Sequence, residues 1–390
     1  MKVIVIGASI SGLHTATLLA KQGVDVEVYD RMNALGSPSR TLIVTGKINE
    51  ILDSVPEEMI LNRVHSLELY SRSRSARLEL SCPDLIVERS RFVEWFVRRA
   101  EEAGAKMILG HRFEGFAQFG RKVVAALRNL ETNEAQQVSA DILVGADGVQ
   151  SAVSQAASRN GHRVSALVQA RVALPEGGER GMYRVWFDTS RTNYFYWLIP
   201  ESDRVAAVGL IAEDVPQAKA RLIEFLRDKQ LETIEFQSAI VPMHQFGGAD
   251  GTVDLNRNVF VVGDAAAQVK VTTVGGVVPG LYGAKALARA ILNGRNYRKE
   301  LGGLKMELHL HLLVRQVLNR FSDRDYDELI GMLDGGLKEI LEDWTRDELT
   351  QCFLRMIWAE PRLITLGAKA FLKSPGLTSP PSKKPPFLHS

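Results

Sequence analysis

Three short segments rich in glycine and aspartate could hold a phosphorylated cofactor, and each one follows a run of β-branched residues. They are Gly7-Ala8-Ser9-Ile10-Ser11-Gly12, Gly145-Ala146-Asp147-Gly148 and Gly263-Asp264-Ala265-Ala266. Glycines let the backbone approach a diphosphate closely, and the N–H groups at the start of a following helix attract its negative charge. Together the segments predict one dinucleotide bound by residues spread over more than half of the chain.

The first segment has the surroundings of a dinucleotide-binding turn. Gly7 and Gly12 occupy the first and third glycine positions of the fingerprint, while Ser9 stands at the middle position. A continuous apolar run precedes the turn, and a helix followed by a second strand is predicted over 13–29. Asp30 ends that strand, where an acidic residue would accept hydrogen bonds from ribose hydroxyls. These features predict a dinucleotide without deciding which one.

The elements that must position these segments alternate between strands and helices, which indicates an α/β fold. Antiparallel strands are predicted within 64–89 and within 163–245, and a helix over 217–229 interrupts the second group. A strongly amphipathic helix is predicted from Phe92 to Ala103. The chain is then expected to be helical from 300 to 373.

The second and third segments resemble motifs of the p-hydroxybenzoate hydroxylase-like flavoproteins. Residues 140–151 are similar to one motif of that family, and residues 259–266 are similar to its second FAD motif. The resemblance implies that the dinucleotide is FAD and that Asp264 contacts its ribityl chain. A strand followed by an Asp-Gly turn would explain either segment alone, but not all three in this order.

The residues after Asp264 resemble the geranylgeranyl reductase family. Members carry Gln-Val-Lys-x-Thr-Thr-Gly-Gly-Gly-Ile, and residues 268–277 read Gln-Val-Lys-Val-Thr-Thr-Val-Gly-Gly-Val. Val274 therefore replaces a glycine and Val277 replaces the isoleucine. The resemblance extends over residues 1–373 and implies an FAD-dependent enzyme that reduces carbon–carbon double bonds of an isoprenoid or similar apolar chain.

A second stretch resembles the same family at its substrate wall. The motif Tyr-x-Trp-x-Phe-Pro corresponds to Phe195, Trp197, Ile199 and Pro200 in this chain. Side chains two positions apart on a strand share a face, so the first three are expected to line an apolar cavity. A strand packing aromatic residues into an ordinary core is the alternative. Flavin-dependent halogenases carry Trp-x-Trp-x-Ile-Pro here, which leaves a halogenase or monooxygenase open.

Two arginines are further candidates near the cofactor. Arg40 follows Ser37-Pro38-Ser39, where many archaeal reductases of the family have a Cys-Gly pair, so a cysteine role does not carry over. It could lie near the flavin or an anionic substrate, or be an exposed loop residue. Arg89 matches an arginine that relatives place near the cofactor, and a structural ion pair is the alternative. The expected cofactor-binding residues are Gly7, Ser9, Ile10, Ser11, Gly12, Asp30, Arg31, Arg40, Arg89, Phe113, Asp147, Gly148, Gly263, Asp264, Gly275, Gly276 and Val277.

The chemistry implied by the resemblance needs a hydride from reduced flavin and a proton for the second carbon. Tyr196, His244 or a water could donate that proton, and the residues alone do not choose. No second dinucleotide fingerprint is visible, so electrons are expected from transiently bound NAD(P)H or from a protein such as ferredoxin. A non-catalytic protein that binds prenyl lipids is another alternative.

The expected organisation is a βαβ, Rossmann-like FAD-binding domain with an inserted antiparallel sheet domain and a C-terminal helical region. The boundaries are 1–62, 86–160 and 250–298 for the FAD-binding domain, 63–85 and 161–249 for the substrate domain, 299–373 for the helical region and 374–390 for a disordered tail.

Composition narrows the partners. The formal net charge is +2 over 390 residues, which gives no indication of nucleic-acid binding. Cys82 and Cys352 are the only cysteines and lack the spacing of a zinc site, so no metal is expected and a cytoplasmic setting fits. No run reaches the roughly 18 apolar residues of a membrane span. Any membrane contact is expected to be peripheral, through the apolar C-terminal helices.

Overall fold

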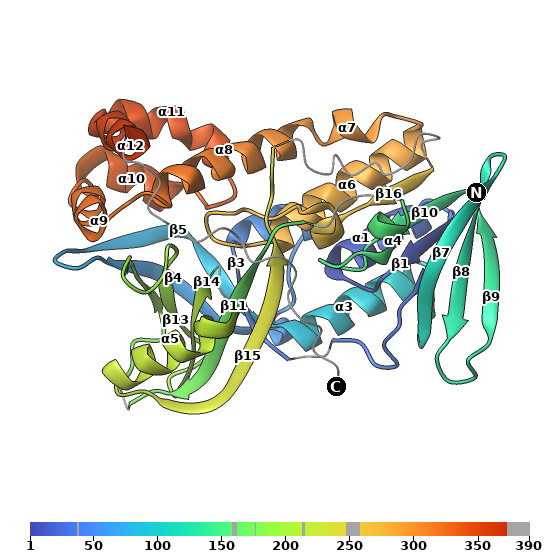
Figure 1. The fold of residues 1–390 in the computed structure, drawn as a ribbon, viewed down its shortest axis with the longest axis horizontal. Helices are drawn as coiled ribbons and strands as arrows, with labels where there is room; N and C mark the ends of the chain where they lie inside the picture. The colour runs from blue at the N-terminus through green and yellow to red at the C-terminus, as the bar shows by residue number, and fades with distance from the viewer. Residues whose placement is uncertain (37–38, 158–161, 176, 213–214, 247–257, 373–390) are drawn as a thin grey trace.

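The computed structural model describes residues 1–36, 39–157, 162–175, 177–212, 215–246 and 258–372. Figure 1 shows an elongated molecule in which two sheets of different kinds lie side by side. A small three-stranded sheet stands at one end of the long axis and a group of short helices at the other. The fold is α/β with a Rossmann-like parallel sheet and a C-terminal helical region, as predicted.

The first layer is a parallel sheet, sheet A, with the strand order β16-β10-β1-β2-β6. Its strands are β1 (Lys2–Ile6), β2 (Asp25–Tyr29), β6 (Lys106–Ile108), β10 (Ile142–Gly145) and β16 (Val259–Val261). Strand β1 has apolar side chains on both faces because both faces are covered, as is usual in parallel sheets.

Three helices cover one face of sheet A and a small antiparallel sheet covers the other. The helices are α1 (Ile10–Ala20), α3 (Arg89–Glu102) and α6 (Val277–Asn293). The opposite side carries β7 (His111–Phe119), β8 (Lys122–Asn129), β9 (Ala135–Ala140) and the short helix α4 (Ala152–Ala156). The helix predicted from Phe92 is α3, and it begins at Arg89, with the Glu88 carboxylate as its N-cap.

The second layer, sheet B, has the strand order β15-β11-β14-β13-β12-β4-β5-β3. Its strands are β3 (Thr41–Val44), β4 (Ile60–Tyr70), β5 (Ser75–Glu88), β11 (Val164–Ala173), β12 (Met182–Trp186), β13 (Tyr196–Pro200), β14 (Val205–Ala212) and β15 (Glu232–Pro242). Helix α5 (Val215–Asp228) packs on the face that β11 and β14 share.

One pair in sheet B differs from the all-antiparallel prediction. Strands β4 and β12 run parallel, while the other pairs in the described sheet are antiparallel. The two strands belong to separate excursions of the chain from sheet A, so no hairpin forces them to run in opposite directions. Strand β3 also lies in sheet B, whereas the expected boundary placed residues 1–62 with the first domain. The domain boundaries therefore stay a prediction.

The described residues from 297 to 372 are mostly helical, as expected from residue 300 onward. The helices are α7 (Tyr297–Glu300), α8 (Gly302–Leu318), α9 (Asp323–Ile330), α10 (Gly335–Asp343), α11 (Leu349–Ala359) and α12 (Arg362–Leu372).

 

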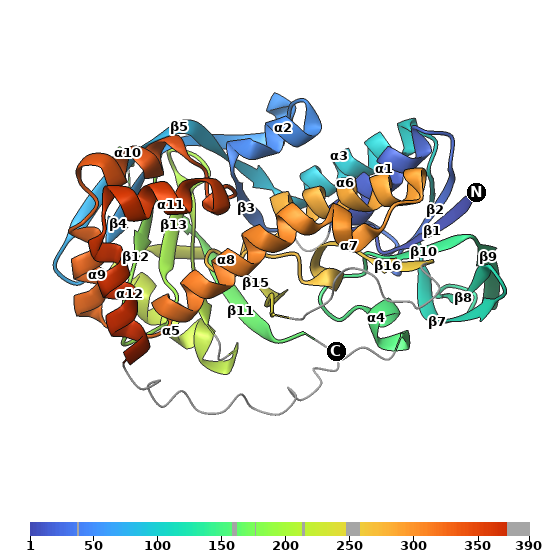
Figure 2. The ribbon, with the colours of Figure 1, turned by 90° about the horizontal axis from the view of Figure 1, so that it is seen from above.

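Helix α8 runs from the edge of sheet A toward the far end of the molecule, where α9 to α12 gather around a core of their own (Figure 2). Short helical segments between the strands are η1 (Gly46–Ile48), α2 (Asn49–Leu52), η2 (Glu57–Met59) and η3 (Gly263–Ala266). No helix in the described part of the chain is long and apolar enough to cross a membrane. The tail expected to be disordered, 374–390, lies outside the described residues.

Candidate functional site

The first two glycine segments meet at Ala146. Gly7 has φ +98°, and a Cβ at this position would lie 2.4 Å from the carbonyl oxygen of Ala146. A Cβ on Gly12 would lie 2.6 Å from the Cβ of Ala146. Ser9 caps helix α1, its Oγ accepting a hydrogen bond from the N–H of Gly12 at 3.2 Å. The glycines are therefore required by the packing of the turn as well as by the proposed diphosphate.

The third segment joins the first through Ser11. A Cβ on Gly263 would lie 2.6 Å from Ser11 Oγ, and a Cβ on Gly280 would lie 2.3 Å from the same atom. Ile10 begins helix α1 directly beside this contact. The structure thus brings the three segments together around the N-terminus of α1, although they are distant in the sequence.

Asp30 lies at the mouth of the first turn. Its carboxylate accepts hydrogen bonds from the N–H groups of Ala8 at 2.7 Å and Met32 at 2.8 Å, so it fixes the turn. Arg31 is exposed beside it. A role for Asp30 in binding ribose hydroxyls stays a prediction, and the structure adds a positioning role.

Asp264 lies close to both candidate arginines. Burial raises the pKa of the Asp264 carboxyl, and the positive charges of Arg40 and Arg89 act against that rise. Burial also lowers the pKa of Arg40 to about 10, and its Nε has no hydrogen-bond partner in the described structure. Arg89 donates from Nη1 to the carbonyl of Gly36 at 2.9 Å. A buried guanidinium nitrogen without a partner fits a polar ligand placed between these groups.

The second segment offers another buried polar atom. Asp147 Oδ2 accepts a hydrogen bond from the N–H of Val153 at 3.1 Å, and its Oδ1 is buried without a partner among the described residues. Burial raises the pKa of this carboxyl. Gly148 has φ +81°, which favours glycine. Phe113 lies instead in the hydrophobic core between sheet A and β7–β9, a position that suits packing.

The predicted substrate wall has the expected alternation. Phe195, Trp197 and Ile199 lie in one apolar cluster beside the third segment, and Pro200 ends strand β13. Tyr196 points to the opposite face, where its ring stacks on Phe225 of α5 at 4.2 Å between centroids. The structure therefore does not bring Tyr196 to the wall, because neighbouring side chains on a strand face opposite sides.

The segment after Asp264 connects the three glycine segments to this wall. The N–H of Lys270 donates to the carbonyl of Gly275 at 3.1 Å, and the N–H of Val274 donates to the carbonyl of Lys270 at 2.7 Å. These bonds close a tight turn in which Val274 has φ +55°. The buried Val274 side chain belongs to the same cluster as Trp197. A β-branched residue in this conformation is strained, whereas the glycine that stands here in the motif this segment resembles would not be.

The N-terminus of helix α6 completes the cofactor side. The helix begins at Val277, after Gly275 and Gly276. A Cβ on Gly276 would lie 3.1 Å from Asp264 Oδ1, so the helix start and the Asp264 carboxylate are neighbours. The free N–H groups of this helix end are placed to favour negative charge on a bound group.

Sequence reasoning missed two ion pairs next to the turn, one fully buried and one partly buried. Lys270 Nζ lies 2.5 Å from Asp347 Oδ1, and both side chains are almost fully buried. Thr45 Oγ1 donates to the other oxygen of Asp347 at 2.5 Å. The second pair joins Arg346 and Asp84 at 2.7 Å. These partners are far apart in the sequence, and no local pattern pairs them.

A second missed feature is a polar chain that ends at Thr272. Its Oγ1 lies 2.6 Å from Nδ1 of His311, and Nε2 of His311 lies 3.2 Å from Glu307 Oε1 without forming an aligned hydrogen bond. Glu307 accepts hydrogen bonds from the N–H and hydroxyl groups of Thr350. Despite burial, these contacts lower the pKa of Glu307 to about 2. No cluster of the described residues has the composition of a metal site.

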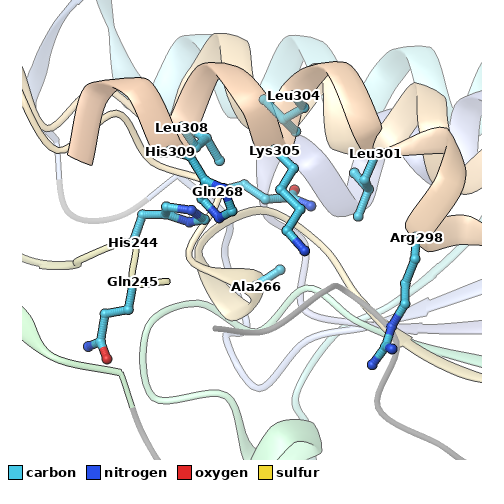
Figure 3. A pocket seen from close by; sticks show the side chains of 10 residues that line it. All are labelled: His244, Gln245, Ala266, Gln268, Arg298, Leu301, Leu304, Lys305, Leu308 and His309. Carbon is cyan, nitrogen blue, oxygen red and sulfur yellow. The ribbon is translucent and has the colours of Figure 1, made fainter. Parts of the chain in front are cut away.

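His244 occupies a pocket between η3 and α8 (Figure 3). Its Nδ1 lies 3.3 Å from the carbonyl oxygen of Ala267, and its ring lies 5.2 Å from that of His309. Burial lowers the pKa of His244 to about 4. Lys305 and Gln268 line the same pocket, whereas none of the three aromatic and aliphatic wall residues does. The structure therefore places His244 in a pocket that none of these wall residues lines, although the neighbouring Met243 packs in the cluster of Trp197.

Comparisons with known proteins agree with this architecture. Residues 1–293 match the FAD binding domain family. A digeranylgeranylglycerophospholipid reductase of Methanothermobacter thermautotrophicus is 26% identical over 367 residues, covering 85% of this chain and 91% of the relative. The solved structure of a geranylgeranyl bacteriochlorophyll reductase-like protein from Thermoplasma acidophilum has a TM-score of 0.76 at 20% identity, covering 95% and 98%. A flavin-dependent halogenase has a TM-score of 0.67 at 16% identity, covering 93% and 77%. At these identities the solved structures share the fold.

Proposed function

The chain belongs to the FAD binding domain family and is an FAD-dependent oxidoreductase, and from that premise we propose that it reduces carbon–carbon double bonds of an isoprenoid lipid or a similarly apolar chain. One observation carries the proposal: a single short segment, residues 263–277, joins the cofactor segments to an apolar wall. The names of the similar reductases support the choice of an isoprenoid.

Residues of this chain suit FAD. The glycine segments leave room for a diphosphate at the N-terminus of α1, where N–H groups would bind it. The unpartnered nitrogen of Arg40 and the unpartnered oxygen of Asp147 are polar groups that a bound dinucleotide could satisfy. We propose that Asp264 and the start of α6 hold the redox end, because both lie where the segment turns toward the wall.

When bound and reduced, FAD supplies a hydride, and the chain supplies the surroundings. The N-terminus of α6 would stabilise negative charge, as helix N-termini do. Trp197 and Ile199 would hold an apolar chain and exclude water. An isolated double bond accepts hydride poorly, so a positioned proton donor is also required.

We propose Thr272 as the group through which that proton passes. It lies on the segment that connects the cofactor side to the wall, and it contacts His311, which faces Glu307. Tyr196 faces the opposite side of its strand, and His244 lies in a pocket that no wall residue lines. Thr272→Val should lower the rate of double-bond reduction roughly 10- to 100-fold with unchanged flavin content. Thr272→Ser, which keeps the hydroxyl, should restore most of the rate, and equal rates in both variants would exclude this route.

Electrons for the reaction would come from transiently bound NAD(P)H or from a protein such as ferredoxin. The halogenase and monooxygenase alternatives share the fold and the Ile199-Pro200 pair. Their products differ, because they add halogen or oxygen instead of hydrogen. A non-catalytic prenyl-lipid-binding protein would show no turnover at all.

An anaerobic experiment tests the proposal. The flavin-loaded protein is reduced with dithionite and mixed with geranylgeranyl lipids or geranylgeranyl diphosphate. We expect the flavin to be reoxidised and mass spectrometry to show products that have gained two hydrogens per reduced double bond. Reoxidation by oxygen alone, with unchanged prenyl compounds, would sink the reductase proposal. Halogenated or oxygenated products in air would support the alternatives.

A further inference from the structure

Helices α11 and α12 expose several large apolar side chains. Trp358 is 87% exposed and Leu354 is 71% exposed, one helical turn apart on α11. Helix α12 exposes Ile364, Phe371 and Leu372, which recur at helical spacing. We call these five residues the apolar face. Exposed large apolar side chains in such a group indicate an interaction surface.

The exposed charges on α11 and α12 themselves are basic. Arg355, Arg362 and Lys369 are exposed on the two helices. Glu360 is the only acidic residue in 349–372, and it is buried with its carboxylate bound to Arg362. Half-buried Glu328 of α9 lies 3.5 Å from Lys369. Exposed Asp334, just before α10, also acts on the charge of Arg362. Within 349–372, basic residues beside Trp, Leu and Phe without an exposed acidic residue are typical of helices that lie on anionic membranes.

The inner side of α12 connects this surface to the substrate wall. Leu366 packs in the same core as Tyr326. The Tyr326 ring stacks on Phe187 at 4.3 Å, and Phe187 lies 6.1 Å from Phe195 of the wall. Apolar contacts are therefore continuous from beneath the apolar face to the place where a lipid chain would be reduced.

We propose that the apolar face docks on an anionic lipid bilayer, with Trp358 and Leu354 entering the interface and the three basic residues meeting lipid phosphates. The choice of a bilayer as partner rests on the proposed lipid substrate. A protein partner would need a complementary shape and complementary charges, whereas α11 and α12 offer large exposed apolar side chains flanked by basic ones. The face also lies at the opposite end of the long axis from β7–β9, which leaves sheet A clear of the bilayer (Figure 1).

Vesicle binding by the full-length, flavin-loaded protein tests this proposal. Sedimentation with vesicles of phosphatidylglycerol and phosphatidylcholine should retain the protein, with weaker retention by phosphatidylcholine alone. Leu354→Ser with Trp358→Ser should weaken binding at least tenfold. The control is Phe119→Ser, since Phe119 is 66% exposed at the far end of the molecule. Arg355→Gln with Lys369→Gln should reduce binding to the anionic vesicles only.

Several outcomes would overturn the proposal. They are absence of vesicle binding, equal loss in the Phe119 control, or association of two copies through the apolar face without lipid binding. Binding that appears only after removal of residues 374–390 would assign the face to the chain's own tail. Vesicle binding needs no substrate and no turnover. If the protein does not bind vesicles, the reductase proposal is unaffected. If the protein is not a reductase, the vesicle measurement still decides whether the apolar face binds a bilayer.

Discussion

The two sheets of this molecule bury polar groups in different ways. Around sheet A, the cofactor segments meet through glycines and backbone N–H groups, and even the buried His14 of α1 is neutral because burial lowers its pKa to about 3. Beside sheet B, side chains of opposite charge form pairs: Lys270 with Asp347, both buried, and half-buried Arg346 with buried Asp84. The backbone groups of the glycine segments leave room for a ligand. The ion pairs instead fill the space between sheet B and the C-terminal helices.

This difference indicates which region is expected to bind a ligand and which is expected to hold the layers together. A glycine turn exposes N–H groups and needs an anion to complete it. A buried ion pair is complete by itself and is costly to break, because removing one partner leaves the other charge unpaired. The segment 263–277 touches both kinds of surroundings. Four substitutions test this contrast, beginning with the largest expected effect.

Gly12→Leu should abolish the cofactor site on the sheet A side. Any Cβ here would overlap Ala146 and the carbonyl of Gly7. We expect FAD binding to weaken at least a thousandfold, about 4 kcal/mol, measured by flavin absorbance after desalting and by titration of the apoprotein. Gly303→Ala in α8 is the control, since an added Cβ there meets nothing within 4 Å. A folded Gly12→Leu protein that still holds flavin would contradict the role of this turn in FAD binding.

Asp347→Asn should destabilise the sheet B side without touching the glycine segments. It leaves the Lys270 charge buried without its partner, which we expect to lower the free energy of unfolding by about 3 kcal/mol. Urea denaturation followed by circular dichroism measures the change. The double variant Lys270→Met with Asp347→Leu removes both charges and should recover most of the loss. If the double variant is as unstable as the single one, packing and not charge is responsible.

The neutral histidine of the sheet A side gives a dependence on pH. His14 has a folded-state pKa of about 3, well below its ordinary value of 6.5. Below pH 6.5 the unfolded chain takes up a proton that the folded chain refuses, so stability falls with pH down to about 3. His14→Leu removes this loss. Its stability relative to the natural chain should rise by about 2 kcal/mol between pH 6.5 and 5.

The measurement is the difference in the free energy of unfolding between His14→Leu and the natural chain, obtained by urea denaturation at each pH. His65 is exposed on β4, and His65→Gln serves as the matched control for changing a histidine. A difference that stays constant from pH 7 to pH 5 would show that His14 is not buried in its neutral form.

The smallest effect concerns the strained turn that joins the two sides. At φ +55° an alanine is strained and a glycine is not. Val274→Gly relieves backbone strain of about 1–2 kcal/mol. It also loses a buried side chain whose burial stabilises the fold by a similar amount. Val274→Ala loses the side chain and keeps strain. We expect Val274→Gly to be more stable than Val274→Ala by about 1 kcal/mol, measured by thermal denaturation. The reverse order would mean that the turn relaxes when the valine is removed.

The cofactor segments could be predicted from the sequence because each is a contiguous strand, turn and helix. The wall alternation at Trp197 followed from strand geometry alone. Residues that pair although they are far apart in the sequence leave no local pattern. The contacts of Lys270 with Asp347 and of Thr272 with His311 could therefore not be predicted. Tyr196 was a reasonable proton donor by chemistry, but the side of the sheet that faces the cofactor depends on how the two layers pack. The parallel β4–β12 pair likewise depends on the path of the whole chain.

The strand order of sheet A has a consequence for synthesis. β16 pairs beside β10, and α6 packs against α1, so this sheet and its helical cover include residues up to Asn293. β1 leaves the ribosome long before these partners exist. At usual rates of translation the interval is roughly 15 to 60 seconds. Until then the nascent first strand lacks its final neighbours, and FAD can complete its site only after the chain has been made as far as Asn293.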